Sequence, residues 1–236
     1  MKCLLAGYGE IGKAVREIFI EENVIDIIDT SSEFKLLVNT VDYEFLLVCF
    51  PYTDCFVDEV KRYVKEYRCK NVIIFSTVAV GTTEQIENAV HCPIEGKHPH
   101  LFDSIRLWKF TVGGRNSSVI QFLNKSEVPF EVIDNPKITE FLKLASTSYY
   151  GVMLEYIRYV DKTIYELGGD FKSFAEYNKN YNRLYSNLGH KEFTRPQLYP
   201  PYGNIGGHCV VPNSKILDEQ FPSPFLKEIY REKENI

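Results

Sequence analysis

Short apolar runs alternate with amphipathic stretches through the first 135 residues of the chain. A short apolar run fits a buried strand, and apolar residues that recur every three or four positions fit a helix that covers a sheet. Repeated alternation of the two predicts a Rossmann-like α/β fold around a mostly parallel sheet. The expected strands are Lys2–Ala6, Val24–Ile28, Phe45–Phe50, Val72–Phe75, Val90–Pro93, Phe110–Gly113 and Phe130–Ile133.

Two stretches between these strands have a clear helical period. After the first strand the apolar positions fall at i, i+3, i+4, i+7 and i+8, on Ile11, Ala14, Val15, Ile18 and Phe19. After the third strand the same kind of stripe is formed by Val57, Val60, Val64 and Tyr67. Each stripe is one face of a helix and is expected to lie on the sheet.

The pattern changes near Pro136, where a long helical period begins. Ile138–Leu167 keeps this period without a proline, and Gly168 and Gly169 provide a stop. We expect a second helix from Phe171 to Leu188, a loop from Phe193 to Gly207 and a short helix from Pro212 to Phe221. The chain therefore divides into an α/β domain, residues 1–135, and a helical domain, residues 136–236.

The long helix is expected to need a partner. Roughly 30 residues at 1.5 Å each give a rod about 45 Å long, more than one small domain covers. We therefore expect a homodimer through residues 138–167. Aromatic residues with helical spacing are expected to form a core between helices, since no basic stripe marks a nucleic-acid surface; they are Tyr149, Tyr150, Tyr156, Tyr159, Tyr165, Phe171, Phe174, Tyr177, Tyr181 and Tyr185.

Composition narrows the class of protein. Hydrophobic residues make up 44% of the chain and charged residues 25%, which excludes a disordered chain. Lys and Arg number 27 against 32 Asp and Glu, a net charge of −5, so neither nucleic acid nor an anionic membrane is an expected partner. No apolar run approaches the roughly 20 residues of a membrane span. The start of the chain soon runs into glycines and charge, so no secretion signal is expected.

The cysteines carry information about the compartment. Most of the six stand in apolar runs and none has a paired spacing, so we expect reduced thiols in a cytoplasmic protein. They are Cys3, Cys49, Cys55, Cys69, Cys92 and Cys209.

A glycine motif follows the first strand and opens the first helix. It is a G-x-G-x-x-G, formed by Gly7, Tyr8, Gly9, Glu10, Ile11 and Gly12. In this context the first glycine permits a tight turn, the second admits a pyrophosphate and the third allows close packing of helix on strand. The free N–H groups of the helix N-terminus then bind the phosphates.

A carboxylate ends the second strand, at Asp29. At that place it accepts hydrogen bonds from the ribose hydroxyls of NAD and repels the 2′-phosphate of NADP, and no arginine follows to neutralise one. The sequence therefore predicts NAD. The alternative is that Asp29 merely caps a strand in a domain that binds something else. We expect the ends of the next two strands, at Phe50, Pro51, Ser76 and Thr77, to complete the cofactor site.

Three further segments resemble one family. They are Phe75–Thr83 (FSTVAVGTT), Phe141–Ala145 (FLKLA) and Gly206–Pro212 (GGHCVVP). In this order, after the glycine motif, they are similar to the nucleotide-sugar 6-dehydrogenases, which include the UDP-glucose and UDP-N-acetylmannosamine dehydrogenases. The resemblance covers residues 1–220, and its most specific part is the G-G-H-C segment.

The resemblance implies a reaction and roles. The family oxidises a primary alcohol of a sugar to a carboxylate with two NAD molecules and a cysteine. It implies that Cys209, in a catalytic loop at residues 203–213, captures the aldehyde, that Lys143 stabilises the oxyanion, and that Thr77 contacts the cofactor and positions a water. The alternatives are a buried Cys209, a solvent-facing Lys143 and a Thr77 that only ends a strand.

The chain also departs from the family pattern. The family has a further UDP-binding domain beyond the residues matched here. Thr147 stands where the family has Asn, and Asn213 stands where it has an Asp that assists thioester hydrolysis, so the second oxidation is in question. The sugar-binding glutamate is displaced by one position, if Glu95 replaces it. The expected substrate residues are Glu95, Lys97, His98, His100, Thr147, Gly207, His208 and Asn213.

The segment from His91 to His100 contains three histidines and a cysteine. Its spacing matches no common zinc pattern, so no metal is expected. We expect instead that Lys97, His98 and His100 bind an anionic group of the substrate beside the nicotinamide; the alternative is an ordinary polar loop.

Three functions fit these residues. The first is an NAD-dependent dehydrogenase that acts on the hydroxyl of a sugar or sugar-like substrate through Cys209 and Lys143. The second is an enzyme similar to β-hydroxyacid dehydrogenases, with Lys143 as acid and base and no need for a cysteine. The third is an NAD-binding protein without activity. Cys209 distinguishes the first from the second, and turnover of an alcohol distinguishes both from the third.

Overall fold

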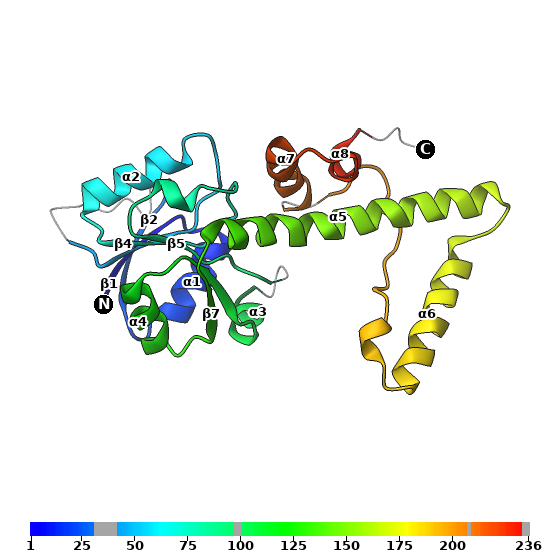
Figure 1. Ribbon diagram of the computed structural model, residues 1–236, viewed down its shortest axis with the longest axis horizontal. Helices are drawn as coiled ribbons and strands as arrows, with labels where there is room; N and C mark the ends of the chain where they lie inside the picture. Colours follow the sequence, from blue (N-terminus) through cyan, green and yellow to red (C-terminus); the bar gives the residue numbers. More distant parts are fainter. Residues whose placement is uncertain (31–41, 97–100, 207–208, 233–236) are drawn as a thin grey trace. The chain divides into compact units, whose positions relative to one another are not determined.

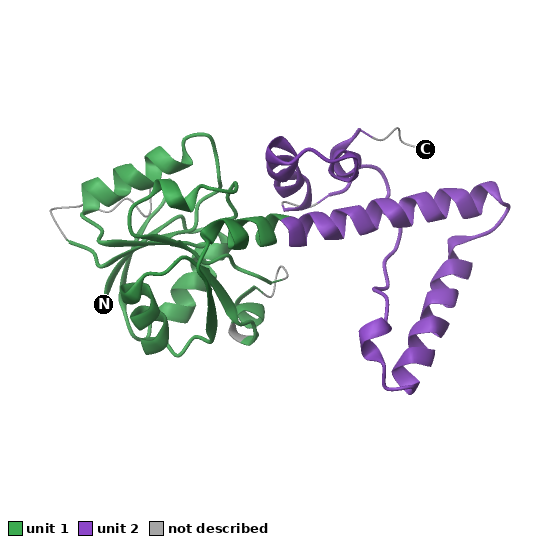
Figure 2. Cartoon of the chain, viewed as in Figure 1, with its two compact units in different colours: residues 1–144 green, residues 145–236 purple. Residues whose placement is uncertain are grey.

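The computed structural model describes residues 1–30, 42–96, 101–206 and 209–232. The chain forms two compact units, residues 1–144 and 145–236 (Figure 2). Helix α5, Pro136–Glu166, belongs to both units, because the division falls within it. The side chain of Asn135 caps this helix by accepting the Lys137 N–H at 3.0 Å.

Unit 1 is built on a seven-stranded sheet of order β2-β1-β3-β4-β5-β6-β7 (Figure 1). Strands β1 to β5 are parallel, and β6 and β7 are parallel to each other. A single antiparallel bridge, between His91 and Gly113, joins β5 to β6. The strands are β1 (Lys2–Ala6), β2 (Val24–Ile28), β3 (Phe45–Val48), β4 (Asn71–Ile74), β5 (Ala89–His91), β6 (Phe110–Gly113) and β7 (Phe130–Ile133).

Helices cover both faces of this sheet. Figure 1 shows α2 (Phe56–Tyr67) on one face and α1 (Glu10–Phe19), α3 (Leu101–Leu107) and α4 (Ser117–Lys125) on the other. Each face has its own buried core. Phe19 of α1 packs between Phe75 and Phe122, with ring centroids 6.0 and 4.8 Å apart. The predicted Rossmann-like, mostly parallel sheet followed by a long helix is confirmed.

Several predicted boundaries were wrong in detail. β3, β4 and β5 end one or two residues earlier than expected, and α7 (Val210–Gln220) begins two residues before Pro212. A proline fits there because the first turn of a helix needs no N–H donor. The sequence analysis also missed α3, α4 and α8 (Pro224–Tyr230), which have only 7, 9 and 7 residues and so present little periodicity.

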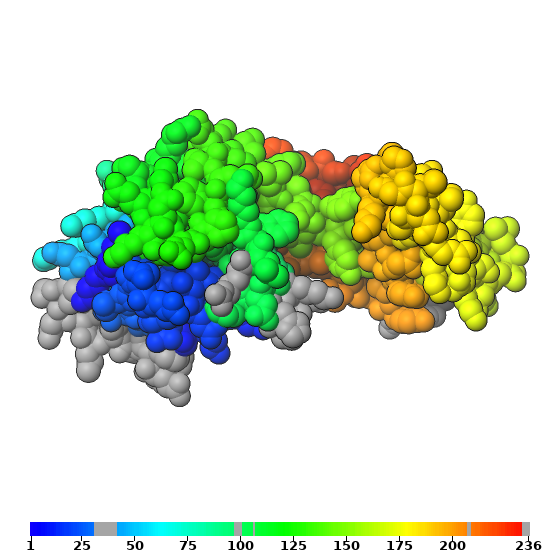
Figure 3. All heavy atoms as spheres, turned by 90° about the horizontal axis from the view of Figure 1, so that it is seen from below, coloured from blue at the N-terminus to red at the C-terminus, as the bar shows by residue number. Residues whose placement is uncertain are grey.

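Unit 2 contains the rest of α5, α6 (Phe171–Asn187), a short 3₁₀ turn η3 (Lys191–Phe193), α7 and α8. The segment after α6 folds back on it, and Figure 3 shows the two side by side in yellow and orange. Asn182 accepts the Arg195 N–H and donates to the Arg195 carbonyl, both at 2.8 Å. The Arg195 guanidinium lies 3.8 Å from the ring centroid of Tyr181.

The aromatic residues of α5 do not form the predicted core. Tyr149, Tyr156, Tyr159 and Tyr165 are 60–80% exposed, and so is Tyr177 of α6. In one copy of the chain the prediction of a helix-to-helix core is therefore wrong for these five residues. The nearest approach to it is in unit 2, where Tyr181, Tyr185 and Phe193 contact one another.

The six cysteines are free thiols. Cys3, Cys49, Cys69 and Cys92 are buried, whereas Cys55 and Cys209 are exposed. Burial raises the pKa of the Cys3 thiol to about 12, which suppresses its thiolate at neutral pH. Among the described helices, none has the length and apolarity needed to cross a membrane.

Candidate functional site

The glycine turn is formed by backbone contacts that leave no room for side chains. Gly7 has a φ of +91°, and a Cβ there would lie 2.7 Å from the Phe50 nitrogen. A Cβ on Gly12 would lie 2.0 Å from the Gly7 carbonyl oxygen. The turn after β1 therefore lies directly against the end of β3. Because β2 and β3 flank β1, this is the point where the strand order reverses, the usual ligand site of such sheets.

The second glycine of the motif faces open space. A Cβ on Gly9 would meet no atom of the described residues within 4 Å. Gly9 is the N-cap of α1, and its carbonyl accepts the Lys13 N–H at 3.0 Å. Glu10 is exposed and Ile11 half-buried in the first turn. The helix end thus presents backbone N–H groups on an uncovered surface, which suits a phosphate.

Asp29 closes the turn from the neighbouring strand. Its Oδ2 accepts the Tyr8 N–H at 2.6 Å, and Gly7 donates its own N–H to the Ile28 carbonyl at 2.9 Å. The carboxylate is half-buried at the end of β2, beside the glycine motif. This is where a dinucleotide would present its ribose hydroxyls.

The ends of β3 and β4 lie next along the sheet. Phe50 and Pro51 follow β3, and Ser76 and Thr77 follow β4. Ser76 is 3% exposed, and its hydroxyl donates to the Phe50 carbonyl at 2.6 Å. Ser76 therefore joins the two strand ends, while Thr77 is half-buried.

His91 joins β4 to the first turn of α5. It is fully buried, with Nε2 3.2 Å from the Ser76 carbonyl oxygen and Nδ1 2.9 Å from the Thr139 hydroxyl. Burial lowers the pKa of His91 to about 3, so the imidazole is neutral at physiological pH. Because a carbonyl can only accept, the contact with Ser76 needs the proton on Nε2, and the Thr139 hydroxyl then shares its single proton between Nδ1 and the Pro136 carbonyl, each 2.9 Å away. In the sequence His91 stood out only as a possible metal ligand, and nothing near it predicted this link.

Glu140 is a second buried residue that joins two elements, here α5 and the loop after β4, and nothing near it in the sequence predicted this role. It has no exposed surface, and its carboxylate accepts the Gly81 N–H at 2.6 Å, the Thr83 N–H at 2.7 Å and the Thr83 hydroxyl at 2.6 Å. Burial raises the pKa of this carboxyl although the three hydrogen bonds oppose the change. Its position could have been noticed in the sequence: Glu140 stands three residues before Lys143, which places both side chains on one face of the predicted helix.

Lys143 lies near the end of unit 1 and is 15% exposed. Its Nζ donates to the Ile94 carbonyl at 2.6 Å and lies 3.3 Å from Glu95 Oε2. The expected substrate residue Glu95 and the expected catalytic Lys143 are thus brought together. The surface-lysine alternative is wrong, because most of this side chain is covered.

Cys209 is exposed in unit 2, where it is the N-cap of α7. Its carbonyl accepts the Asn213 N–H at 3.0 Å. Asn213 is buried, and its amide donates to the Thr147 hydroxyl at 3.3 Å. The two positions that depart from the family pattern therefore contact each other, and neither is a carboxylate.

The loop before Cys209 is held to α5 within unit 2. Arg158 donates to the Gly203 carbonyl at 2.6 Å, and Glu155 lies 3.2 Å from the guanidinium. Helices α7 and α8 pack closely against α5 at Gly151, since a Cβ there would lie 2.8 Å from the Val210 side chain and 2.9 Å from the Ile229 side chain. The expected substrate residues Lys97, His98, His100, Gly207 and His208 lie outside the described residues.

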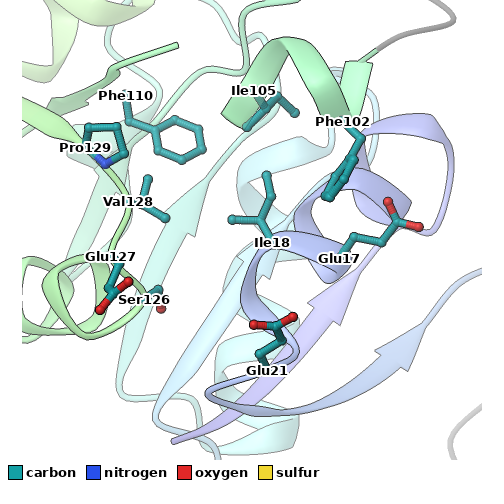
Figure 4. Close-up of a pocket in the computed structure, with 10 residues that line it drawn as sticks. All are labelled: Glu17, Ile18, Glu21, Phe102, Ile105, Phe110, Ser126, Glu127, Val128 and Pro129. Carbon is teal, nitrogen blue, oxygen red and sulfur yellow. The ribbon is translucent and has the colours of Figure 1, made fainter. Parts of the chain in front are cut away.

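A cavity of about 320 Å³ lies elsewhere, beside the C-terminal half of α1 (Figure 4). Its floor is apolar, and three carboxylates stand around it. None of the residues predicted for cofactor or substrate lines it, and the glycine turn is at the other end of α1. The lining residues are Glu17, Ile18, Glu21, Phe102, Ile105, Phe110, Ser126, Glu127, Val128 and Pro129.

The glycine turn gives a matched pair of substitutions. Gly12→Ala places a methyl group against the Gly7 carbonyl and should lower the free energy of unfolding by about 1–3 kcal/mol. Gly9→Ala adds its methyl group in open space and should leave that free energy unchanged. Urea denaturation of the two variants measures both values. Equal stability of the two variants would contradict the packing described here.

The buried histidine should make stability depend on pH. The unfolded chain binds a proton to His91 below pH about 6.5, whereas the folded chain binds it only near pH 3. Stability from this group is therefore present above pH about 6.5 and should fall by about 2 kcal/mol between pH 7 and pH 5. His91→Gln should remove that part of the pH dependence in urea denaturation. His190→Gln changes an exposed histidine and is the control; a wild-type slope in His91→Gln would refute the assignment.

No family model matches the chain, and no curated protein matches it. Solved structures do. The chain is similar to a UDP-glucose dehydrogenase from Pyrobaculum islandicum, with a TM-score of 0.73 and 15% identity over 97% of this chain and 66% of that one. It is similar to the UDP-N-acetyl-mannosamine dehydrogenase from S. aureus, with a TM-score of 0.64 and 18% identity over 98% of this chain and 67% of that one.

A third similar structure is the 3-hydroxyisobutyrate dehydrogenase from Mycobacterium tuberculosis with L-serine. Its TM-score is 0.67 at 11% identity, and the match covers 97% of this chain and 90% of that one. This chain therefore spans nearly the whole of one kind of dehydrogenase and about two thirds of the other. At these identities the similarity shows that the chain shares their fold.

Proposed function

We propose that this protein is an NAD-dependent oxidoreductase that acts on a CH–OH group. The observation that carries the proposal is the glycine turn at the β1/β3 switch point, where Gly7 and Gly12 admit no side chain and Gly9 faces open space. This arrangement fits a dinucleotide, whose pyrophosphate the N–H groups of the first turn of α1 would hold. When bound, the nicotinamide ring accepts a hydride from the carbon that carries the hydroxyl.

The choice of NAD rests on Asp29. The Tyr8 N–H holds this carboxylate at 2.6 Å, so it is fixed rather than free to turn away. A fixed carboxylate favours the two ribose hydroxyls and repels a 2′-phosphate. The site would extend along the strand ends to Phe50, Pro51 and Thr77. The Ser76 hydroxyl holds Phe50 by a hydrogen bond to its carbonyl.

Calorimetric titration tests the cofactor. We expect the wild-type protein to bind NAD more tightly than NADP. Asp29→Asn should weaken the affinity for NAD and reduce the ratio of the two affinities about tenfold, since one charge–hydroxyl interaction is worth about 1.5–3 kcal/mol. Asp42→Asn removes an exposed carboxylate that pairs with Arg68 and is the control. Equal binding of the two cofactors by the wild-type protein would contradict the role of Asp29.

Lys143 is the proposed acid–base group. Its Nζ is oriented by the Ile94 carbonyl at 2.6 Å and by Glu95 Oε2 at 3.3 Å, and most of the side chain is covered. In this role the amine takes the hydroxyl proton as the hydride leaves, and it returns that proton in the reverse direction. This chemistry needs no cysteine, and it supports a hydroxy acid as one substrate class.

A second candidate is a sugar or sugar-nucleotide alcohol, oxidised with the help of Cys209. The favouring observation is an exposed thiol at the N-terminus of α7, on a loop that Arg158 holds at Gly203. The thiolate would add to the aldehyde carbon to form a C–S bond, and the carbonyl oxygen would take a proton. The adduct would then lose its hydroxyl proton and a hydride, the hydride going to a second NAD, to give a thioester whose C–S bond water must cleave.

That last cleavage is where this chain should be slow. General-base assistance is worth about 10²–10⁴-fold, and Asn213 has no basic oxygen to provide it. With a substrate that it oxidises, intact-protein mass spectrometry should show an adduct on Cys209 that is absent in Cys209→Ala and released faster in Asn213→Asp. Cys55→Ala removes the other exposed thiol and should keep the adduct. Full turnover by Cys209→Ala would leave the lysine mechanism in its place.

We also propose that two copies associate through residues 138–167, which are α5 from Ile138 onward together with Leu167. The support is the exposure of Tyr149, Tyr156, Tyr159 and Tyr165 on that helix, each 60% or more, because exposed apolar patches often mark association surfaces. Sedimentation velocity should give a species of twice the 27.4 kDa chain mass. Joint replacement of Tyr156 and Tyr159 by Glu should give monomers, whereas Tyr202→Glu, in a loop, should not. A wild-type monomer at high concentration would refute the dimer.

A further inference from the structure

We infer that Glu140 is a positioning residue for the cofactor: its buried carboxylate fixes the loop that follows β4, and with it Thr77, against helix α5. The inference rests on the proposed function, because it assigns Thr77 to the nicotinamide end of the cofactor site. Glu140 itself has no exposed surface and so contacts neither cofactor nor substrate.

The loop after β4 is anchored at both ends. At its start the Ser76 hydroxyl donates to the Phe50 carbonyl, and His91 donates to the Ser76 carbonyl. At its far end Gly81 and Thr83 donate three hydrogen bonds of 2.6–2.7 Å to Glu140. Thr77 lies between the two anchors. At the far anchor one carboxylate accepts all three hydrogen bonds, so the Glu140 side chain holds this end of the loop against α5.

The geometry of the far anchor requires a carboxylate. Oε2 accepts from the Gly81 N–H, and Oε1 accepts from both donors of Thr83. An amide has only one accepting oxygen, so Glu140→Gln would set an NH₂ group against one of these donors. Gly81 has a φ of +92°, which glycine adopts without strain and which lets its N–H point at this carboxylate.

The same carboxylate links the loop to the proposed acid–base group. Glu140 and Lys143 are three residues apart on α5, and therefore on one face of the helix. Lys143 in turn holds the Ile94 carbonyl, at the end of the next strand. The Glu140 side chain thus fixes the position of the loop that carries Thr77 relative to the helix that carries Lys143.

Binding of two probes separates this role from a general loss of structure. NADH contains the nicotinamide, and ADP-ribose lacks it but keeps the groups expected at Gly9 and Asp29. In fluorescence and calorimetric titrations we expect Glu140→Gln to weaken NADH about tenfold and ADP-ribose less than about twofold. Glu84→Gln is the matched control: it breaks an exposed ion pair with Lys137 between the same loop and helix and should change neither affinity.

A milder variant guards against failure to fold. Thr83→Val removes only the hydroxyl donor and should weaken NADH about threefold without changing ADP-ribose. An equal loss of both ligands, or no loss in folded Glu140→Gln and Thr83→Val, would overturn the inference while leaving the proposed function in place. Failure of the wild-type protein to bind either probe would overturn the proposed function, and this inference with it.

Discussion

The close approach of two backbones at the switch point of the sheet is the constraint on which unit 1 depends. Gly7 turns the chain after β1 while the end of β3 lies against it, and Gly12 presses α1 onto the same turn. Any side chain at these two positions would separate elements that carry both hydrophobic cores. The same contacts place the N-terminus of α1, which no described residue covers at Gly9, beside Asp29, so the packing requirement and the proposed cofactor site have one origin.

A second requirement concerns buried polar groups. His91 and Glu140 lie inside unit 1, where an unpaired imidazole or carboxylate would cost several kcal/mol. Each instead has partners on a separate element, so each is satisfied in only one docking of α5. We therefore regard these two residues as the groups that specify where the helix begins relative to the strand ends. Thr77 and Lys143, the residues proposed to act on cofactor and substrate, take their positions from that docking.

The sequence predicted features that depend on neighbouring residues and missed those that depend on distant ones. Strands, α1, α2, α5 and the glycine turn have local patterns, and the fold class followed from them. The link from His91 to Thr139 spans 48 residues and that from Glu140 to Thr83 spans 57, so no local pattern announces either. The prediction for the exposed tyrosines of α5 was wrong for a related reason: a helical period indicates a helix but does not show what covers its side chains.

Of the predicted site, Gly7, Gly9, Gly12 and Asp29 come together in unit 1, as do Glu95 and Lys143. Cys209, Asn213 and Thr147 come together in unit 2. The contact between Asn213 and Thr147 gives a physical reason for two departures that looked independent in the sequence. A hydroxyl and an amide satisfy each other there without a charge, which a lone buried carboxylate could not do.

The central claim is that the glycine turn holds a dinucleotide, and a crystal structure of the protein with NAD tests it most directly. The account predicts pyrophosphate oxygens within hydrogen-bonding distance of the first-turn N–H groups of α1, over Gly9, and ribose hydroxyls on the Asp29 carboxylate. A dinucleotide bound in the cavity beside Glu17 and Glu21, or a glycine turn that remains empty at saturating NAD, would contradict it.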